Sequence, residues 1–97
     1  MHVSVSWPIK TPTDKSGTIT TGATAQNVCA ANVKRKGFWF QNVSDTDMWL
    51  SEIGTAVATQ PAVKVAAGQF FEFPVTPVGA ISVICATTGK AFSAREW

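Results

Sequence analysis

The side chains that could carry out catalysis are few in this chain of 97 residues. It contains one histidine, His2, and two cysteines, Cys29 and Cys85. Nucleophilic catalysis of the Ser-His-Asp or Cys-His kind needs an imidazole held against the nucleophile, and His2 lies in an N-terminal segment that prolines separate from the rest. These three side chains also cannot complete a tetrahedral zinc site within one chain. We expect the two cysteines to be buried free thiols, although the sequence leaves their pairing open.

The acidic residues are also poorly arranged for chemistry. Paired carboxylates for glycoside hydrolysis could be drawn from Asp45, Asp47, Glu52 and Glu72. Asp45 and Asp47 fall in a stretch of turn composition, residues 44–47, where they would be exposed and hydrated. Their spacing lacks the further acidic positions and the glycine of a calcium loop, and the isolated glycines of the chain form no phosphate-binding loop. The sequence therefore predicts no enzyme, no cofactor and no metal site.

Charge and hydropathy narrow the possible partners. Eight basic and six acidic residues give a net charge of +2, which is too little for the basic face that nucleic-acid binding requires. The only basic cluster is Lys34, Arg35 and Lys36, which is either a solvated turn between strands or a docking site for an acidic surface. The first residues lack the pattern of a secretory signal, and no apolar run could span a bilayer, so we expect a cytoplasmic origin and no membrane partner.

The composition favours strands over helices. The chain has 11 Val, 5 Ile and 12 Thr against a single Leu. Short runs of β-forming residues alternate with turn signals, and none shows sustained helical periodicity. These runs cover residues 18–21, 26–31, 37–43, 47–53, 62–66, 69–74, 79–86 and 91–96. We therefore predict an all-β fold, an antiparallel β-sandwich or jelly-roll-like barrel of about eight short strands.

An extended N-terminal arm precedes this predicted domain. Residues 2–7 alternate, so that Val3, Val5 and Trp7 share one side of a half-buried strand. Pro8 and Pro12 then interrupt regular structure, and residues 8–16 have the composition of a linker. We expect residues 1–16 to be an arm with its linker and residues 17–97 to be the β-sandwich domain. The arm could add as a strand to the sheet edge of a neighbouring molecule.

Several predicted strands carry large apolar residues on both faces. In the predicted hairpin over residues 37–52, Phe38 and Phe40 share a face with Asn42, whereas Trp39 lies on the other face, and Trp49 is on the opposite face from Met48 and Leu50. A second hairpin is predicted around a bend at Gly68, between residues 62–66 and 69–74, and it turns Phe70 outward.

In an antiparallel sandwich of this size only one face of each sheet meets the internal core. The second apolar faces must then meet an arm, a neighbouring subunit or another protein, unless bulges fold both faces into one distorted core. We therefore expect a homo-oligomer or a docked protein. The candidate interface residues are Val3, Val5, Trp7, Lys34, Arg35, Lys36, Trp39, Trp49 and Phe70.

Three blocks carry a resemblance to a known class of proteins. They are GFWFQNVSDTDMW at 37–49, AGQFFEFP at 67–74 and GAISVICATTGKAFSAREW at 79–97. Over residues 17–97 the chain resembles small virion structural proteins of tailed bacteriophages. The resemblance implies a β-sandwich or jelly-roll-like module built into the particle, and it carries over no active site.

These observations together predict a structural virion protein, assembled in the cytoplasm of a bacterial host. The expected role is capsid decoration and stabilisation through homo-oligomeric packing, with a trimer favoured by the local threefold sites of a capsid lattice and with the arm docked on the shell. Two alternatives stay open. One is a fibre or tail component. The other is a carbohydrate-binding module for host-surface polysaccharide, in which Trp7, Trp49 or Trp97 stacks on sugar rings beside Asp45, Asp47 or Asn42.

Overall fold

The computed structural model describes residues 11–97. The arm residues Val3, Val5 and Trp7, together with His2, lie outside this range, so their predicted roles stay predictions. Nine strands make up the described part of the chain. They are β1 (Thr13–Asp14), β2 (Gly17–Thr18), β3 (Gln26–Cys29), β4 (Phe38–Asn42), β5 (Met48–Ser51), β6 (Val63–Val65), β7 (Phe70–Phe71), β8 (Ile81–Cys85) and β9 (Ala91–Glu96).

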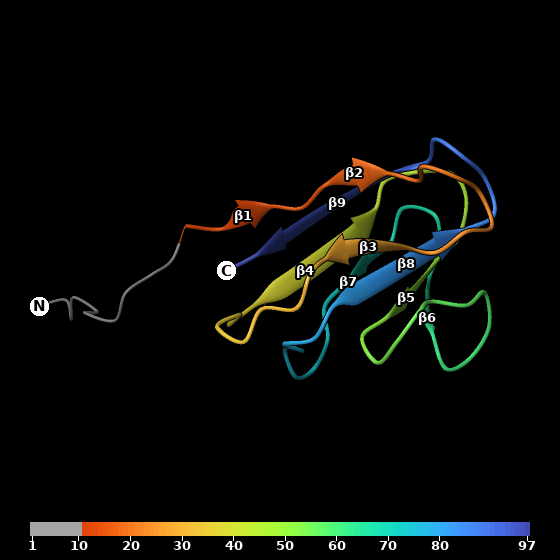
Figure 1. Ribbon diagram of the computed structural model, residues 1–97. Coiled ribbons are helices and arrows are strands. Elements are labelled where there is room, and N and C mark those ends of the chain that lie inside the picture. Colours follow the sequence, from red (N-terminus) through yellow and green to blue (C-terminus); the bar gives the residue numbers. More distant parts are fainter. Residues whose placement is uncertain (1–10) are drawn as a thin grey trace, which may run out of the picture.

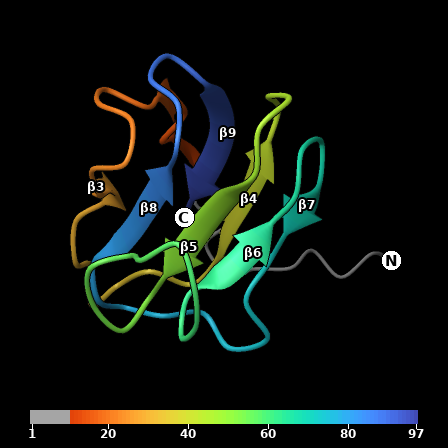
Figure 2. The ribbon, with the colours of Figure 1, turned by 90° about the vertical axis from the view of Figure 1, so that its right-hand side faces the viewer.

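The strands form two antiparallel sheets packed face to face (Figure 2). Sheet A has the order β1-β9-β4-β7, with β2 also paired to β9, and sheet B has the order β3-β8-β5-β6. This arrangement confirms the predicted all-β sandwich, and each of the eight predicted runs overlaps one strand. Over residues 11–97 we find no helix of the length and apolarity needed to cross a membrane.

The edge strand of sheet A begins at Thr13, before residue 17, where the domain was predicted to start. Thr13 pairs with Glu96 and Gly17 pairs with Phe92, so β1 and β2 follow β9 in a single register along its length. At the break between the two strands, the Ser16 hydroxyl accepts a hydrogen bond of 3.1 Å from the amide of Ala94. Part of the segment expected to be a linker, residues 8–16, is therefore a paired edge strand from Thr13 onward (Figure 1).

The core lies between the two sheets and follows the predicted alternation. Phe38 and Phe40 of β4 point inward, and the ring of Phe40 stacks on Phe92 of β9 at 5.3 Å between centroids. From sheet B the inward residues include Met48 and Leu50. The other buried residues of the hydrophobic core are Ile19, Val28, Cys29, Val65, Phe73, Ile81, Val83, Cys85 and Ala94.

Neither predicted hairpin forms within one sheet. β4 pairs with β9 and β7 in sheet A, whereas β5 pairs with β6 and β8 in sheet B. The chain likewise passes from β6 in sheet B to β7 in sheet A. The turns were located correctly, since Gly68 has φ +79° and supports a tight reversal. The error was in the pairing, because each of these turns carries the chain from one sheet to the other.

Asn42 explains how the two crossing turns are held together. Its buried side-chain amide donates to the carbonyls of Thr46 and Val65, at 2.7 and 2.9 Å. Its side-chain oxygen accepts from the amide and the hydroxyl of Ser44. Its backbone exchanges hydrogen bonds with Gly68 and Gln69 in the other turn. Asn42 lies where the chain leaves β4 and sheet A. There it forms hydrogen bonds with backbone groups of both turns, which in a hairpin would pair with the neighbouring strand.

Candidate assembly surface and ligand pocket

The outer face of sheet A carries an aromatic patch. Trp39 of β4 lies 5.5 Å from Phe70 of β7, measured between ring centroids. The guanidinium of Arg95 on β9 sits 5.2 Å from the Trp39 ring centroid, in the geometry of a cation–π contact. Arg95 also forms an ion pair of 3.2 Å with Asp14 on β1. The side chain of Phe70 is 56% exposed. We call Trp39, Phe70 and Arg95 the aromatic patch.

Trp49, the third aromatic residue predicted at an interface, is on the other side of the molecule. It lies on the outer face of sheet B, directly across from Ile84 on β8 and Lys64 on β6. The loop between β5 and β6 folds back over this face, because the amide of Ala56 donates to the Ser82 hydroxyl at 2.9 Å and Ala56 is buried. A single contact surface containing Trp39, Phe70 and Trp49 is therefore excluded, and the chain itself covers part of the second apolar face.

A pocket remains over Trp49 where that loop leaves the sheet. Its volume is about 430 Å³. Five segments line it: the turns after β2 and β4, strand β5, the β5–β6 loop and the end of β8. The lining residues are Ala23, Thr46, Asp47, Trp49, Ala58, Ile84, Cys85 and Ala86. Beside it, Asp47 forms an ion pair of 3.3 Å with Lys64, and the two side chains are 46% and 52% exposed.

The basic cluster is split by burial. Arg35 was predicted to dock on a surface, and its side chain is instead 0% exposed, so this prediction is wrong for Arg35. Its Nε donates to Glu96 Oε1 at 2.8 Å, and Nη1 donates to the carbonyls of Pro77 and Gly79. Nη2 donates to the carbonyl of Ala30 at 2.7 Å and to Cys29 Sγ at 3.2 Å. The guanidinium carries five N–H donors in a fixed geometry, which suits it to bind several buried acceptors at once. Arg35 therefore belongs neither to a solvated turn nor to a docking site.

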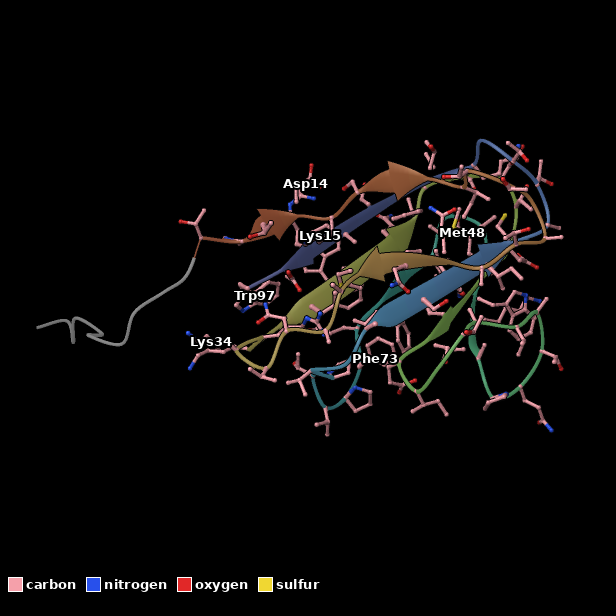
Figure 3. The ribbon with its side chains drawn as sticks, in the orientation of Figure 1. Asp14, Lys15, Lys34, Met48, Phe73 and Trp97 are labelled. Atoms are coloured by element: carbon pink, nitrogen blue, oxygen red, sulfur yellow. The ribbon has the colours of Figure 1, made fainter. Side chains whose placement is uncertain are left out.

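Lys34 and Lys36 remain exposed at one end of the sandwich. Figure 3 shows Lys34 and Trp97 at the end where the described chain begins. Strand pairing places the same residues together. Thr13 and Phe38 both lie opposite Glu96, and Gly37 exchanges backbone hydrogen bonds with Trp97. Exposed apolar side chains from the neighbouring loops, Val33 and Val75, add to this end. Two lysines and two valines thus lie at the end of the sandwich where the described residues begin.

The cysteines are buried free thiols, which resolves the pairing that the sequence left open. Burial raises the pKa of the Cys29 thiol, which disfavours the reactive thiolate.

Of the acidic candidates, Asp45 forms an ion pair of 2.7 Å with Lys90, and this hydrogen bond lowers the pKa of Asp45. Within residues 11–97 no three His, Cys, Asp or Glu side chains gather where they could hold a metal ion.

Sequence reasoning named Arg35 and Asn42 as candidate contact residues but missed their structural roles, by which they organise this architecture. Asn42 follows Phe38 and Phe40 on the same face of its strand, which indicates that its amide points inward. A buried amide needs hydrogen-bond partners, so this position could have been recognised as structural. The alternation of β9 carried a comparable signal at Glu96, whose inward carboxylate requires a cation. Nothing local to residues 34–36 distinguishes the buried Arg35 from the two exposed lysines beside it.

Searches of protein-family models, curated proteins and solved structures return no match to this chain.

Proposed function

We propose that this chain is a non-enzymatic structural protein of a tailed-bacteriophage particle, assembled in the host cytoplasm. It decorates the head as a homo-oligomer, and a trimer fits the local threefold sites of a capsid lattice. The resemblance of residues 17–97 to small virion proteins supplies the phage context. The observation that carries the assembly role is the aromatic patch of Trp39, Phe70 and Arg95 on the outer face of sheet A.

The composition of the patch suits a contact between proteins. Tryptophan, phenylalanine and arginine are enriched at protein interfaces, whereas lysine and glutamate are depleted there. Covering a phenylalanine side chain contributes about 1.5–3 kcal/mol, which makes Phe70 a candidate anchor. A stable interface buries roughly 800 Å² on each partner, so the patch would form its centre and neighbouring residues of sheet A its rim.

The end of the sandwich that carries Lys34 and Lys36 supports a second contact, with the shell. The described residues begin at this end, so the preceding arm and the two lysines can reach the same surface. In this arrangement Val3, Val5 and Trp7 add to a sheet edge of the shell protein, and the lysines approach its acidic groups. A fibre or tail position would use the same two surfaces.

The oligomeric state of the purified chain tests the assembly role. By multi-angle light scattering we expect the wild-type chain to be a trimer and Phe70→Ser to be a monomer with unchanged circular dichroism, because Phe70 is exposed. Val75→Ser is the matched control, since Val75 is 82% exposed in the loop between β7 and β8 and lies outside the patch. Equal masses for all three proteins would contradict the proposed role of the patch.

Incorporation into particles tests the virion role directly. Virions purified from a lysate should contain the chain. Particles assembled without it should take up the purified wild-type protein in a density gradient and should take up Phe70→Ser poorly. Virions that lack the chain would overturn the phage assignment, whatever its oligomeric state.

A further inference from the structure

We propose that the pocket over Trp49 binds a pyranose ring, and so serves as a carbohydrate site on the sheet opposite the aromatic patch. This inference does not depend on the assembly role. The sequence offered three tryptophans and three polar residues for such a site. Among residues 11–97, the structure brings one tryptophan, Trp49, and one of the three polar residues, Asp47, together in the lining of this pocket.

The other candidates are occupied elsewhere. Asn42 is fully buried and bonded to both crossing turns. Asp45 is paired with Lys90 and does not line the pocket. The indole of Trp97 packs where a Cβ of Gly37 would be, so residue 37 covers part of its ring. Trp7 lies outside the described residues.

Two large apolar side chains, Trp49 and Ile84, contribute to the lining of the pocket, and we call them its floor. Trp49 and Ile84 lie opposite each other on neighbouring strands and are both half-buried, so they present part of their surface to the cavity. The walls include Ala23, Ala58 and Ala86, whose single methyl groups leave room above the indole. A volume of about 430 Å³ falls within the range of small-molecule sites. A pyranose ring has one face of C–H groups, which stacks on an indole.

The rim supplies polar groups beside that floor. Asp47 Oδ2 faces Lys64 Nζ at 3.3 Å, and Asp47 Oδ1 accepts a hydrogen bond of 3.3 Å from the amide of Ala67. A carboxylate has about four acceptor sites and an ammonium three donors, so both groups retain capacity for a ligand. An acceptor next to a donor complements the neighbouring hydroxyls of a sugar, while Thr46 adds a hydroxyl at the same rim.

Other ligand classes fit this lining less well. A wholly apolar ligand would remove water from Asp47 and Lys64 without replacing its hydrogen bonds, which is unfavourable. A phosphate or other anion would meet the Asp47 carboxylate at the rim, and the one rim cation, Lys64, is already paired with that carboxylate. A neutral polyol with one apolar face satisfies both the floor and the rim.

The test follows the indole N–H signals of the tryptophans by NMR during titration of the full chain with D-glucose, D-galactose, D-mannose and N-acetyl-D-glucosamine. We expect at least one sugar to shift the Trp49 signal saturably, with a dissociation constant on the order of millimolar, while the Trp39 signal stays in place. Cyclohexanol, which has the apolar ring and a single hydroxyl, serves as the comparison probe.

Two variants assign the binding to the pocket without disturbing its floor. Ala58→Leu fills the cavity from the exposed loop and should weaken binding at least about tenfold. Ala31→Leu is the matched control, since residue 31 is an exposed alanine outside the lining, and it should bind like the wild type. Asp47→Asn keeps the shape of the side chain and removes its charge, and it should weaken binding about fivefold.

Three results would overturn the proposal. One is a Trp49 signal that no sugar shifts. Another is binding that Ala58→Leu leaves unchanged. The third is a shift by cyclohexanol as large as that by the sugars, which would mark an apolar site. None of these results bears on the oligomeric state, so failure here is distinguishable from failure of the assembly role.

Discussion

Arg35 Nε donates to Glu96 Oε1 at 2.8 Å and so joins the turn before β4 to the last residue of β9. Both side chains are largely withdrawn from solvent, and Lys15 Nζ approaches the other carboxylate oxygen at 3.6 Å. The remaining guanidinium donors reach carbonyls of the loop before β8. The Arg35 guanidinium thereby connects both sheets at the end of the sandwich where the described residues begin.

Removing this guanidinium should be strongly destabilising. Arg35→Ala would leave three backbone carbonyls without their side-chain partner and Glu96 with only the longer ion pair to Lys15 among the contacts described above, and breaking a buried pair in this way costs about 3–5 kcal/mol. Lys36→Ala, at the exposed neighbour, should change the free energy of unfolding by less than about 0.5 kcal/mol. Urea denaturation of the two variants measures the difference. Similar midpoints for both would show that Arg35 is not a structural centre.

The same pair predicts how stability depends on pH. Burial alone would raise the pKa of Glu96, but the hydrogen bond and charge of Arg35, together with Lys15, hold it below the ordinary value of 4.5. A lowered pKa in the folded state means that the ionised carboxylate stabilises the fold above this ordinary value. The contribution is lost as the pH falls through the lower, folded-state value.

Denaturation at a series of pH values would detect this contribution. The free energy of unfolding of the wild type should fall more steeply below the ordinary pKa of Glu96 than that of Glu96→Gln, which has no carboxylate to protonate. Parallel curves for the two proteins would contradict the assignment. Asp14 and Asp45, whose pKa values are also lowered, contribute equally to both curves.

Asn42 should be irreplaceable for the crossing turns. Asn42→Ala removes the amide that bonds Thr46 and Val65, and each buried group left unsatisfied costs about 1–3 kcal/mol. Gln41→Ala is the control, because Gln41 lies on the outer face and makes one weak bond of 3.4 Å. Thermal unfolding should show a much lower midpoint for Asn42→Ala alone. Equal midpoints would mean that the turns hold without the amide.

Gly37 and Trp97 should behave as one coupled pair. A Cβ at residue 37 would run into the Trp97 indole, so Gly37→Ala should displace the indole and destabilise the fold by about 1–3 kcal/mol. In the Trp97→Ala background the same change should have little effect, because the obstructing ring is gone. A double-mutant cycle with coupling below about 0.5 kcal/mol would rule out this contact.

The N-terminal arm should be needed for attachment and not for folding. A chain lacking residues 1–9 retains every strand from β1 to β9, so its circular dichroism and unfolding midpoint should match those of the full chain. Its uptake into particles should be lost if Val3, Val5 and Trp7 dock on the shell. Undiminished uptake would refute docking by the arm.

Local pattern in the sequence was enough to predict the strands and the direction of most side chains. Phe38 and Phe40 alternate with Trp39 at a period of two, and the structure places the first two in the core and the third outside. The pattern also identified Phe70 as outward and placed Met48 and Leu50 on the opposite face from Trp49, and the structure buries both of them. This succeeded because alternation follows from strand geometry, which each segment carries by itself.

Only the tertiary structure decided which strands pair and which outward residues share a surface. A turn such as residues 43–47 can close a hairpin or carry the chain to the other sheet, and the choice depends on contacts with β6, β7 and β9 far along the chain. That choice separated Trp49 from Trp39 and Phe70, and it placed the pocket over Trp49. The same pairing places Glu96 beside Arg35, which is 61 residues away in the sequence. The Arg35 charge is therefore buried, although the adjacent Lys34 and Lys36 had suggested an exposed cluster.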